Sequence, residues 1–415
     1  MFREEVSFRE PVFLGSRTEL SSSIFLRSAL GEIGSSANMI GFQRVRTTWS
    51  PQAYCQPSLK SLSYFTGTMV PYSPLALSAY RTILIRDSED EAIMRDIFLA
   101  VYPTLLTVLS QSNYTIFPND EGVPYLVKLD DNPMSLKQIT ELADNVDKTT
   151  FTLYTQNNRY NGRNLILNDV NSIKQSNWDS RRQTIIVTHG WNSAGTKQVC
   201  TLIRDAYLKI SNSNVIIVDW STIANNIIYS QVAKSVPTVA NHVAAFVNFL
   251  RAHAGLQTSK LKIIGHSLGA HIAGLSAREV SKSSRVPEVI ALDPAKPLFD
   301  SKNPGERVDK TDANNVQVIH TCAGLLGLDK DVGTSDFYAN GGRNQPGCSN
   351  DLLGSCAHGR SYEYYSESIT NAQGFVGISE NGNSKAYMGG PILDSNARGA
   401  YNFRTTSQPP YAIAG

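Results

Sequence analysis

Residues 261–274, LKIIGHSLGAHIAG, hold one serine, Ser267, between two glycines in the pattern G-x-S-x-G. An apolar run leads into the serine and an apolar stripe at helical spacing leaves it, which predicts a strand, a sharp turn and a helix. In that setting a serine hydroxyl can attack an ester carbonyl. Gly265 and Gly269 are needed because side chains there would clash where strand and helix backbones pass closely. We therefore expect Ser267 to be a nucleophile, and the N–H of Leu268 at the helix start to hold a developing oxyanion.

A serine hydroxyl needs a base to take its proton and an acid to orient that base. After a serine in this setting, the acid and the histidine follow in that order along the chain. Asp293 ends the apolar run EVIALD, so it is expected at the sheet edge where the serine lies. Two histidines follow it: His320, at the end of a predicted strand in VIHT, and His358, in the predicted loop CAHGRS. The order by itself leaves both open as the base.

Short β-branched runs recur along the chain and predict the sheet that must position these residues. Several are continuously apolar, which is typical of strands buried on both faces of a parallel sheet. Between them, residues 240–253 carry apolar side chains at helical spacing. Strands that alternate with helices predict an α/β fold with crossover helices. The predicted strands are 150–155, 184–189, 214–220, 261–267, 288–293 and 316–321, and strands and loops are expected from about Gly374 onward.

Five motifs, in one order, resemble the pancreatic lipase family, and particularly its insect secreted branch with the wasp venom phospholipases. The motifs are IIGHSLGAHIAG, ALDPAKPLF, VQVIHT, FYANGGRNQPGC and CAHGRSYEYY. The resemblance runs from about Asn113 to the C-terminus and covers no part of Met1 to Ile93. It implies an α/β-hydrolase fold with a mostly parallel central sheet.

The resemblance also implies roles for individual residues. It makes Ser267 the nucleophile, Asp293 the orienting acid and His358 the general base and acid, so that His320 is a structural residue of its strand. THGW, at 188–191, matches the family's oxyanion segment. The backbone N–H of Trp191 then becomes the second oxyanion donor beside that of Leu268.

Four cysteines remain once Cys55, in the stretch outside the resemblance, is set aside. Cys348 and Cys356 are close enough to close a small loop, and we expect a disulfide between them. Whether Cys200 pairs with Cys322 cannot be read from their positions.

In the resembled family, the loop between the two cysteines that precede the catalytic histidine forms a lid. Here that loop is SNDLLGS, in which only the pair Leu352–Leu353 could cover an apolar trough. A short lid resembles the family members that act as phospholipase A1 and leaves room for a polar head group. The chain also stops where the family's C-terminal β-sandwich would begin, so no colipase partner is expected.

The overall composition is that of a soluble globular protein. Hydrophobic residues make up 41% and charged residues 18%, and the net charge is +2. This mild balance, without a Lys/Arg-rich run, does not predict a nucleic-acid partner. No window offers the roughly 18 continuous apolar residues of a membrane span.

From Met94 the chain reads MRDIFLAVYPTLLTVLSQS, with a short charged start, an apolar run and small residues. This layout over 94–112 is that of a secretory signal peptide, although a buried helix or strand pair is the alternative. We expect Met94 to be the natural start and residues 1–93 to be a gene-model artefact or a disordered extension. The lipase-type domain would then span 113–415, in an extracellular protein.

One further fragment, RVDKTDA, resembles the family's calcium-binding turn, with Asp309 and Asp312 three residues apart. The acidic ligand expected a little earlier falls on Pro304. Two solvated turn acids are therefore the favoured interpretation, and a structural calcium the alternative.

These observations predict a secreted serine hydrolase that cleaves fatty-acyl esters of lipids at a membrane or emulsion surface, with no cofactor required. A phospholipase A1 is favoured over a triacylglycerol lipase. A non-catalytic, yolk-protein-like binding member of the same fold is the alternative from another class. The apparent signal peptide and the expected disulfide disfavour an intracellular esterase.

Overall fold

The computed structural model describes residues 113–119, 121–130, 132–349 and 351–413, all within one compact unit, Leu77–Gly415. The extension over 1–93, the signal peptide over 94–112 and Cys55 lie outside the described residues. No helix among the described residues is long and apolar enough to cross a membrane.

The described residues form an 11-stranded sheet with the order β12-β11-β13-β10-β9-β8-β7-β5-β6-β3-β4. From β6 to β13 every neighbouring pair is parallel, whereas the outer strands on both sides pair antiparallel. The parallel strands are β6 (Asn214–Asp219), β5 (Thr184–Thr188), β7 (Leu261–His266), β8 (Glu288–Leu292), β9 (Asn315–His320), β10 (Ser335–Ala339) and β13 (Gly399–Phe403). The antiparallel outer strands are β3 (Thr150–Tyr154), β4 (Arg163–Leu165), β11 (Val376–Ser379) and β12 (Lys385–Tyr387).

The central strands are apolar throughout because helices cover both faces of the sheet. Along β5, Ile186 packs into the core on one face, and Ile185 and Val187 pack into the core on the other. This is the two-residue alternation of a strand, with a buried partner on each side.

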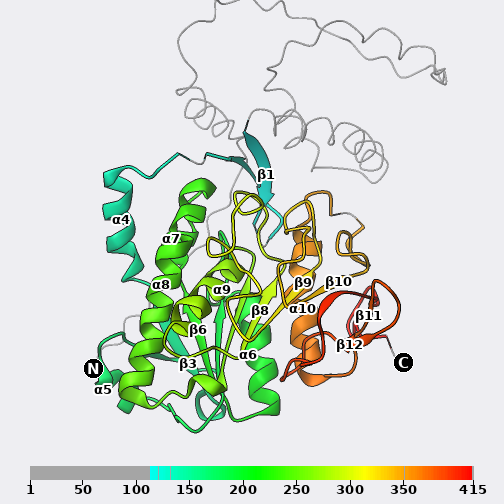
Figure 1. Ribbon diagram of the computed structural model, residues 1–415. Helices are drawn as coiled ribbons and strands as arrows, with labels where there is room; N and C mark the ends of the chain where they lie inside the picture. Colours follow the sequence, from blue (N-terminus) through cyan, green and yellow to red (C-terminus); the bar gives the residue numbers. More distant parts are fainter. Residues whose placement is uncertain (1–112, 120, 131, 350, 414–415) are drawn as a thin grey trace, which may run out of the picture. The chain divides into compact units, whose positions relative to one another are not determined.

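Two long helices cover each face of the sheet (Figure 1). On one face α8 (Tyr229–Ala254) packs against α9 (Leu268–Ser281), and on the other α6 (Gln198–Ile210) packs against α10 (Ser355–Thr370). The short helices are α4 (Leu136–Val146), α5 (Val170–Lys174) and α7 (Ser221–Ala224), with 3-10 turns at Gln156–Asn158 and Thr258–Lys260.

The sequence explains these helices locally. In α8, Val243, Val247 and Leu250 recur at helical spacing and are all buried, so one stripe faces the sheet. The α4 helix begins at a capping box, in which the Ser135 side chain accepts from the N–H of Gln138 and the Gln138 side chain accepts from the N–H of Ser135.

A separate antiparallel hairpin, β1 (Tyr114–Pro118) and β2 (Pro124–Lys128), forms its own two-stranded sheet. Its turn is closed by Asn119, whose side chain accepts hydrogen bonds from the backbone N–H groups of Glu121 and Val123. Figure 1 shows β1 outside the main sheet, beyond one end of its strands.

The predicted α/β architecture is confirmed, and so are all six predicted strands, as β3 and β5 to β9. The β1–β2 hairpin, β4 and β10 were not predicted, whereas β11, β12 and β13 lie in the region where strands and loops were expected. The structure also shows that Cys200 and Cys322 do not form a disulfide with each other. Cys200 belongs to one buried cluster and Cys322 to the other, where its Sγ lies beside Gly354.

Candidate active site

Ser267 lies at the sharp turn between the end of β7 and the start of α9. Its backbone has φ 58° and ψ −123°, a conformation that glycine tolerates but that strains an L-residue. The side chain is 3% exposed, and its Oγ has no hydrogen-bond partner among the described residues. A strained, buried and unsatisfied hydroxyl is costly to fold, which points to a use outside stability.

The glycines around the serine are required by contact distances. A Cβ on Gly265 would overlap the carbonyl of Gly269, and a Cβ on Gly269 would overlap the carbonyl of His189. A Cβ on Gly190 would lie 2.7 Å from the Cβ of Ser267. The segment after β5 therefore passes directly beside the serine.

Asp293 follows β8 immediately and is fully buried. Its Oδ1 accepts hydrogen bonds from the backbone N–H groups of Thr321, at 2.8 Å, and Cys322, at 3.0 Å. Its Oδ2 lies 2.6 Å from Nδ1 of His358. Because an ionised carboxylate can only accept, His358 donates from Nδ1.

This hydrogen bond leaves Nε2 of a neutral His358 with a free lone pair. Nε2 is buried and has no hydrogen-bond partner among the described residues. His358 and Ser267 line the same cavity, together with Trp191 and Tyr362. The structure thus brings together the three residues Ser267, Asp293 and His358 that the sequence singled out.

His358 lies in the first turn of α10, so the loop predicted around it is wrong. Its N–H donates to the carbonyl of Gly354 at 2.8 Å, which is the first-turn bond of a helix. The helical start was hidden in the sequence because Gly354, with φ 83°, takes the place of a Ser, Thr or Asp cap.

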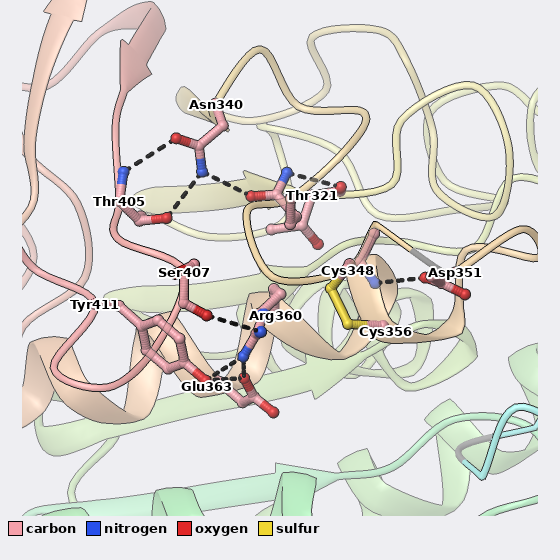
Figure 2. The surroundings of a disulfide bond; sticks show 12 residues. Thr321, Asn340, Cys348, Asp351, Cys356, Arg360, Glu363, Thr405, Ser407 and Tyr411 are labelled. Carbon is pink, nitrogen blue, oxygen red and sulfur yellow. Dashed lines mark hydrogen bonds and ion pairs between the residues drawn. A yellow bond between two sulfur atoms is a disulfide. The ribbon is translucent and has the colours of Figure 1, made fainter. Parts of the chain in front are cut away.

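A disulfide between Cys348 and Cys356, with a Cα–Cα distance of 5.7 Å, holds the start of α10, as expected. Figure 2 shows it beside Asp351, whose side chain also accepts from the N–H of Ala357 at 2.9 Å. One turn further on, Arg360 binds Glu363 and the hydroxyl of Tyr411. These contacts fix the helix that carries His358.

His266, next to the serine, was not singled out in the sequence. Its Nε2 lies 3.2 Å from the carbonyl of His358, and the two rings are 4.3 Å apart. Burial lowers the pKa of His266 well below its usual range, so the ring is neutral and donates this bond. The link holds the first turn of α10 against the end of β7.

Trp191 follows β5 with a buried side chain whose Nε1 donates to the carbonyl of Asn226 at 2.9 Å. Among the backbone hydrogen bonds that lie outside helices and strands in the described residues, none has the N–H of Trp191 or of Leu268 as donor. The N–H of Leu268 directly follows Ser267 in the chain. The N–H of Trp191 directly follows Gly190, which contacts Ser267. The role of these two amides as oxyanion donors stays a prediction.

His320 is fully buried and lies away from this cavity. Its Nε2 is 3.0 Å from Oδ1 of Asp336, and its Nδ1 is 3.0 Å from the carbonyl of Leu328. Burial alone would lower the pKa of His320, but the hydrogen bond and charge of Asp336 outweigh it and raise the pKa. Both ring nitrogens are engaged, so the structure leaves His320 no free nitrogen for the serine.

The turn with Asp309 and Asp312 differs from the expectation of two solvated acids, because both are buried. The N–H of Asp309 donates to Oδ2 of Asp312 at 2.8 Å, and the guanidinium of Arg278 lies 3.5 Å from Oδ1 of Asp312. Calcium takes about six to eight oxygen ligands. Two carboxylates are fewer ligands than that, and Arg278 already places a positive charge beside Asp312, so a structural calcium stays the alternative prediction.

Residues of the β1–β2 hairpin also line the serine's cavity, which the sequence did not indicate. They are Phe117, Pro118 and Asn119, at the end of β1 and the start of its turn. The available signal was the run YTIFP followed by the turn sequence NDEG. By contrast, Leu353 of the disulfide loop is buried, and neither it nor Leu352 is among the described residues lining this cavity.

Residues 128–399 match the family model described as Lipase. The chain belongs to the lipase family. This lipase-family chain is 34% identical over 253 residues to pancreatic triacylglycerol lipase of Mus musculus, covering 56% of this chain and 54% of that one. It is 35% identical over 214 residues to phospholipase A1 VesT1.02 of Vespa tropica, covering 49% of this chain and 71% of that one.

The chain spans about half the length of the pancreatic lipases that it matches. Among solved structures it is similar to MGS-M1, an α/β-hydrolase enzyme from a deep-sea metagenome library, at 20% identity and a TM-score of 0.27, covering 43% of this chain and 72% of that one. Family membership and the mostly parallel sheet give the chain an α/β-hydrolase fold.

Proposed function

We propose that this lipase-family chain is a secreted hydrolase of lipid esters. The observation that carries the proposal is the 2.6 Å contact between His358 and Asp293, which turns an unpartnered Nε2 into the same cavity as the strained Ser267. A base held by a carboxylate beside a serine is the arrangement that activates a hydroxyl.

In the proposed reaction, Nε2 of His358 takes the proton of Ser267 as the serine attacks the acyl carbonyl. The backbone N–H groups of Trp191 and Leu268 hold the oxyanion of the tetrahedral intermediate. His358 then gives the proton to the leaving alcohol, and a water activated by His358 releases the fatty acid from the acyl-enzyme. Asp293 stays ionised and holds the imidazole in the tautomer that leaves Nε2 unprotonated.

A phospholipid, cleaved at its sn-1 ester, is the favoured substrate. The loop between Cys348 and Cys356 holds only seven residues, so it offers little apolar cover for an oil interface. One curated relative of this chain is a phospholipase A1, and another is a triacylglycerol lipase. Triacylglycerol is therefore the second candidate.

The substrate test uses a phospholipid labelled separately at sn-1 and sn-2, beside a triacylglycerol emulsion, with Ser267→Ala as the control. Serine-dependent release from sn-1 alone is the expected result. Release mainly from the triacylglycerol emulsion would support the hydrolase function and contradict the proposal that a phospholipid is the substrate. No release from either, together with no labelling by a fluorophosphonate, would leave a lipase fold that binds without catalysis.

Secretion is supported by the signal-peptide layout over 94–112 and by the disulfide, which needs an oxidising compartment. The test is N-terminal sequencing of the chain recovered from the medium of a eukaryotic host. A mature start near Asn113 is expected. A start upstream of Met94 would refute the signal peptide.

A further inference from the structure

The entrance to Ser267 is closed in this structure. The cavity that Ser267 shares with His358 has a volume of about 10 Å³, which is roughly the space that one water molecule requires. Sites for ligands of ordinary size have volumes of about 300 Å³ or more. An acyl chain cannot enter until something beside the serine moves.

Phe117 of β1 occupies the space next to the base. It is 2% exposed, and its ring is 6.1 Å from that of His358 and perpendicular to it. The same ring lies 5.6 Å from that of Trp191 and 5.1 Å from that of Tyr229. The inward face of the hairpin thus inserts an aromatic plug among residues of α10, α8 and the oxyanion segment.

Three contacts near the tip of the hairpin hold it beside the site. At its tip, Glu121 forms an ion pair with Lys197 at the start of α6, and a Cβ on Gly122 would lie 3.1 Å from Oγ of Ser355 at the start of α10. On β2, Tyr125 packs edge-on against Trp191, with ring centroids 5.3 Å apart. The hairpin tip is therefore attached to residues on several sides of the serine's cavity, which Phe117, Pro118 and Asn119 line.

The hairpin can leave without disturbing the main sheet. Within the described part of the chain, β1 pairs with β2 alone, and neither strand is hydrogen-bonded to the 11-stranded sheet. The hydrogen bond from Leu129 N–H to the Asn113 carbonyl closes the hairpin on itself. Displacement would therefore break side-chain contacts and one ion pair but no ladder of backbone hydrogen bonds.

The outer face of the hairpin is apolar as well. Leu126, which alternates with the inward residues Tyr125 and Val127, is 46% exposed, and Val123 beside it is 49% exposed. When the hairpin opens, Phe117 loses its contacts with the rest of the chain. Because the hairpin carries apolar side chains on both faces, it can then bury both faces in a lipid surface. Such a surface favours the open position because it contacts both faces of the hairpin there, whereas it contacts only the outer face in the closed position.

We propose that the β1–β2 hairpin is the cover of the catalytic serine, that Phe117 is its plug, and that contact with a lipid surface displaces it. This inference rests on the proposed hydrolase function. It assigns to residues 114–128 the covering role that the sequence suggested for the disulfide loop.

The test locks the hairpin shut in the full chain. Glu121→Cys and Lys197→Cys are combined in a Cys55→Ser background and bridged with a short bis-maleimide, because the two side chains are already in contact. Cys200 and Cys322 are buried and shielded from the reagent. The matched control is the same variant capped with a mono-maleimide.

Two rates are measured for each form: labelling by a fluorophosphonate and hydrolysis of p-nitrophenyl butyrate, with and without phosphatidylcholine vesicles. The bridged form is expected to react at least about tenfold more slowly than the capped form, and vesicles should accelerate the capped form only. Equal rates in the two forms would contradict the proposal that the β1–β2 hairpin covers Ser267. No reaction in the capped form or the unmodified chain would instead refute the hydrolase function itself.

A second pair of variants tests the plug without a cross-link. Phe117→Ala removes the ring that faces His358, whereas Leu126→Ala removes an outward side chain of the same hairpin. Labelling without vesicles should be several-fold faster in Phe117→Ala than in the unmodified chain and unchanged in Leu126→Ala. Equal labelling rates in the two variants would show that Phe117 does not block the entrance.

Discussion

Nδ1 of His358 lies 2.6 Å from Oδ2 of Asp293, although 65 positions separate the two residues in the chain. The other carboxylate oxygen accepts two backbone N–H groups from the segment after β9. Asp293 is thus fixed by the sheet before it meets the imidazole. The backbone therefore fixes Asp293, and Asp293 fixes the orientation of the His358 imidazole. Exchanging one carboxylate oxygen for another group should for this reason change the activity.

Asp293→Asn should lower kcat by about 10⁴-fold while leaving the chain folded. An asparagine can keep one oxygen as acceptor, but its NH₂ group would donate to Nδ1 of His358 and force the proton onto Nε2. The rate of p-nitrophenyl butyrate hydrolysis and the melting temperature check this together. Nearly full activity with a normal melting temperature would move the orienting role to another acid.

The strain at Ser267 can be separated from its chemistry. Ser267→Ala removes the hydroxyl and keeps a Cβ at φ 58°, whereas Ser267→Gly removes both. Both variants should lose fluorophosphonate labelling, and Ser267→Gly should be about 1 kcal/mol more stable to unfolding in urea than Ser267→Ala. Equal stabilities would mean that the turn stores no strain.

Loss of the disulfide should lower turnover as well as stability, because Cys356 lies two residues before His358. Replacing both Cys348 and Cys356 with serine should cost about 2–3 kcal/mol of unfolding free energy, the entropy of closing so short a loop. The kcat should fall at temperatures where the variant is still folded, since the first turn of α10 loses a covalent anchor. Retained kcat well below the melting temperature would show that Asp351 and Arg360 fix the helix by themselves.

Asp312 makes stability depend on pH in an unusual direction. Burial raises the pKa of Asp312 from its ordinary value of 3.8 to about 6, although Arg278 lowers it. The folded chain therefore holds a proton that the unfolded chain releases, so stability falls as the pH rises from about 4 to about 6. The shift corresponds to about 3 kcal/mol, as an order of magnitude.

Asp312→Asn keeps an acceptor for the N–H of Asp309 and removes the titration. The variant should melt above the unmodified chain at pH 8, and the difference should shrink toward pH 4. Calcium should leave the melting temperature of the unmodified chain unchanged. A calcium-dependent rise would instead show that the two buried acids hold a cation.

The chemistry-bearing residues could be found from the sequence because they are tied to local patterns. Ser267 follows an apolar strand and precedes a helical stripe, and Asp293 ends another strand, so their positions follow from strand and helix periods alone. Residues in continuous apolar runs, such as 184–188, had to be buried on both faces. Periodicity therefore determined the sheet and the edge at which the serine lies.

The tertiary structure decided what periodicity does not encode. The strand and helix periods do not distinguish His320 from His358 as the base. The packing of α10 beside β7 puts His358 in the cavity, whereas His320 is hydrogen-bonded to Asp336. The distribution of Cys200 and Cys322 over two buried clusters, and the contact of Phe117 with His358, likewise depend on contacts between distant segments. Such contacts form because buried surface and hydrogen bonds are shared across the whole domain, and no short stretch of sequence specifies them.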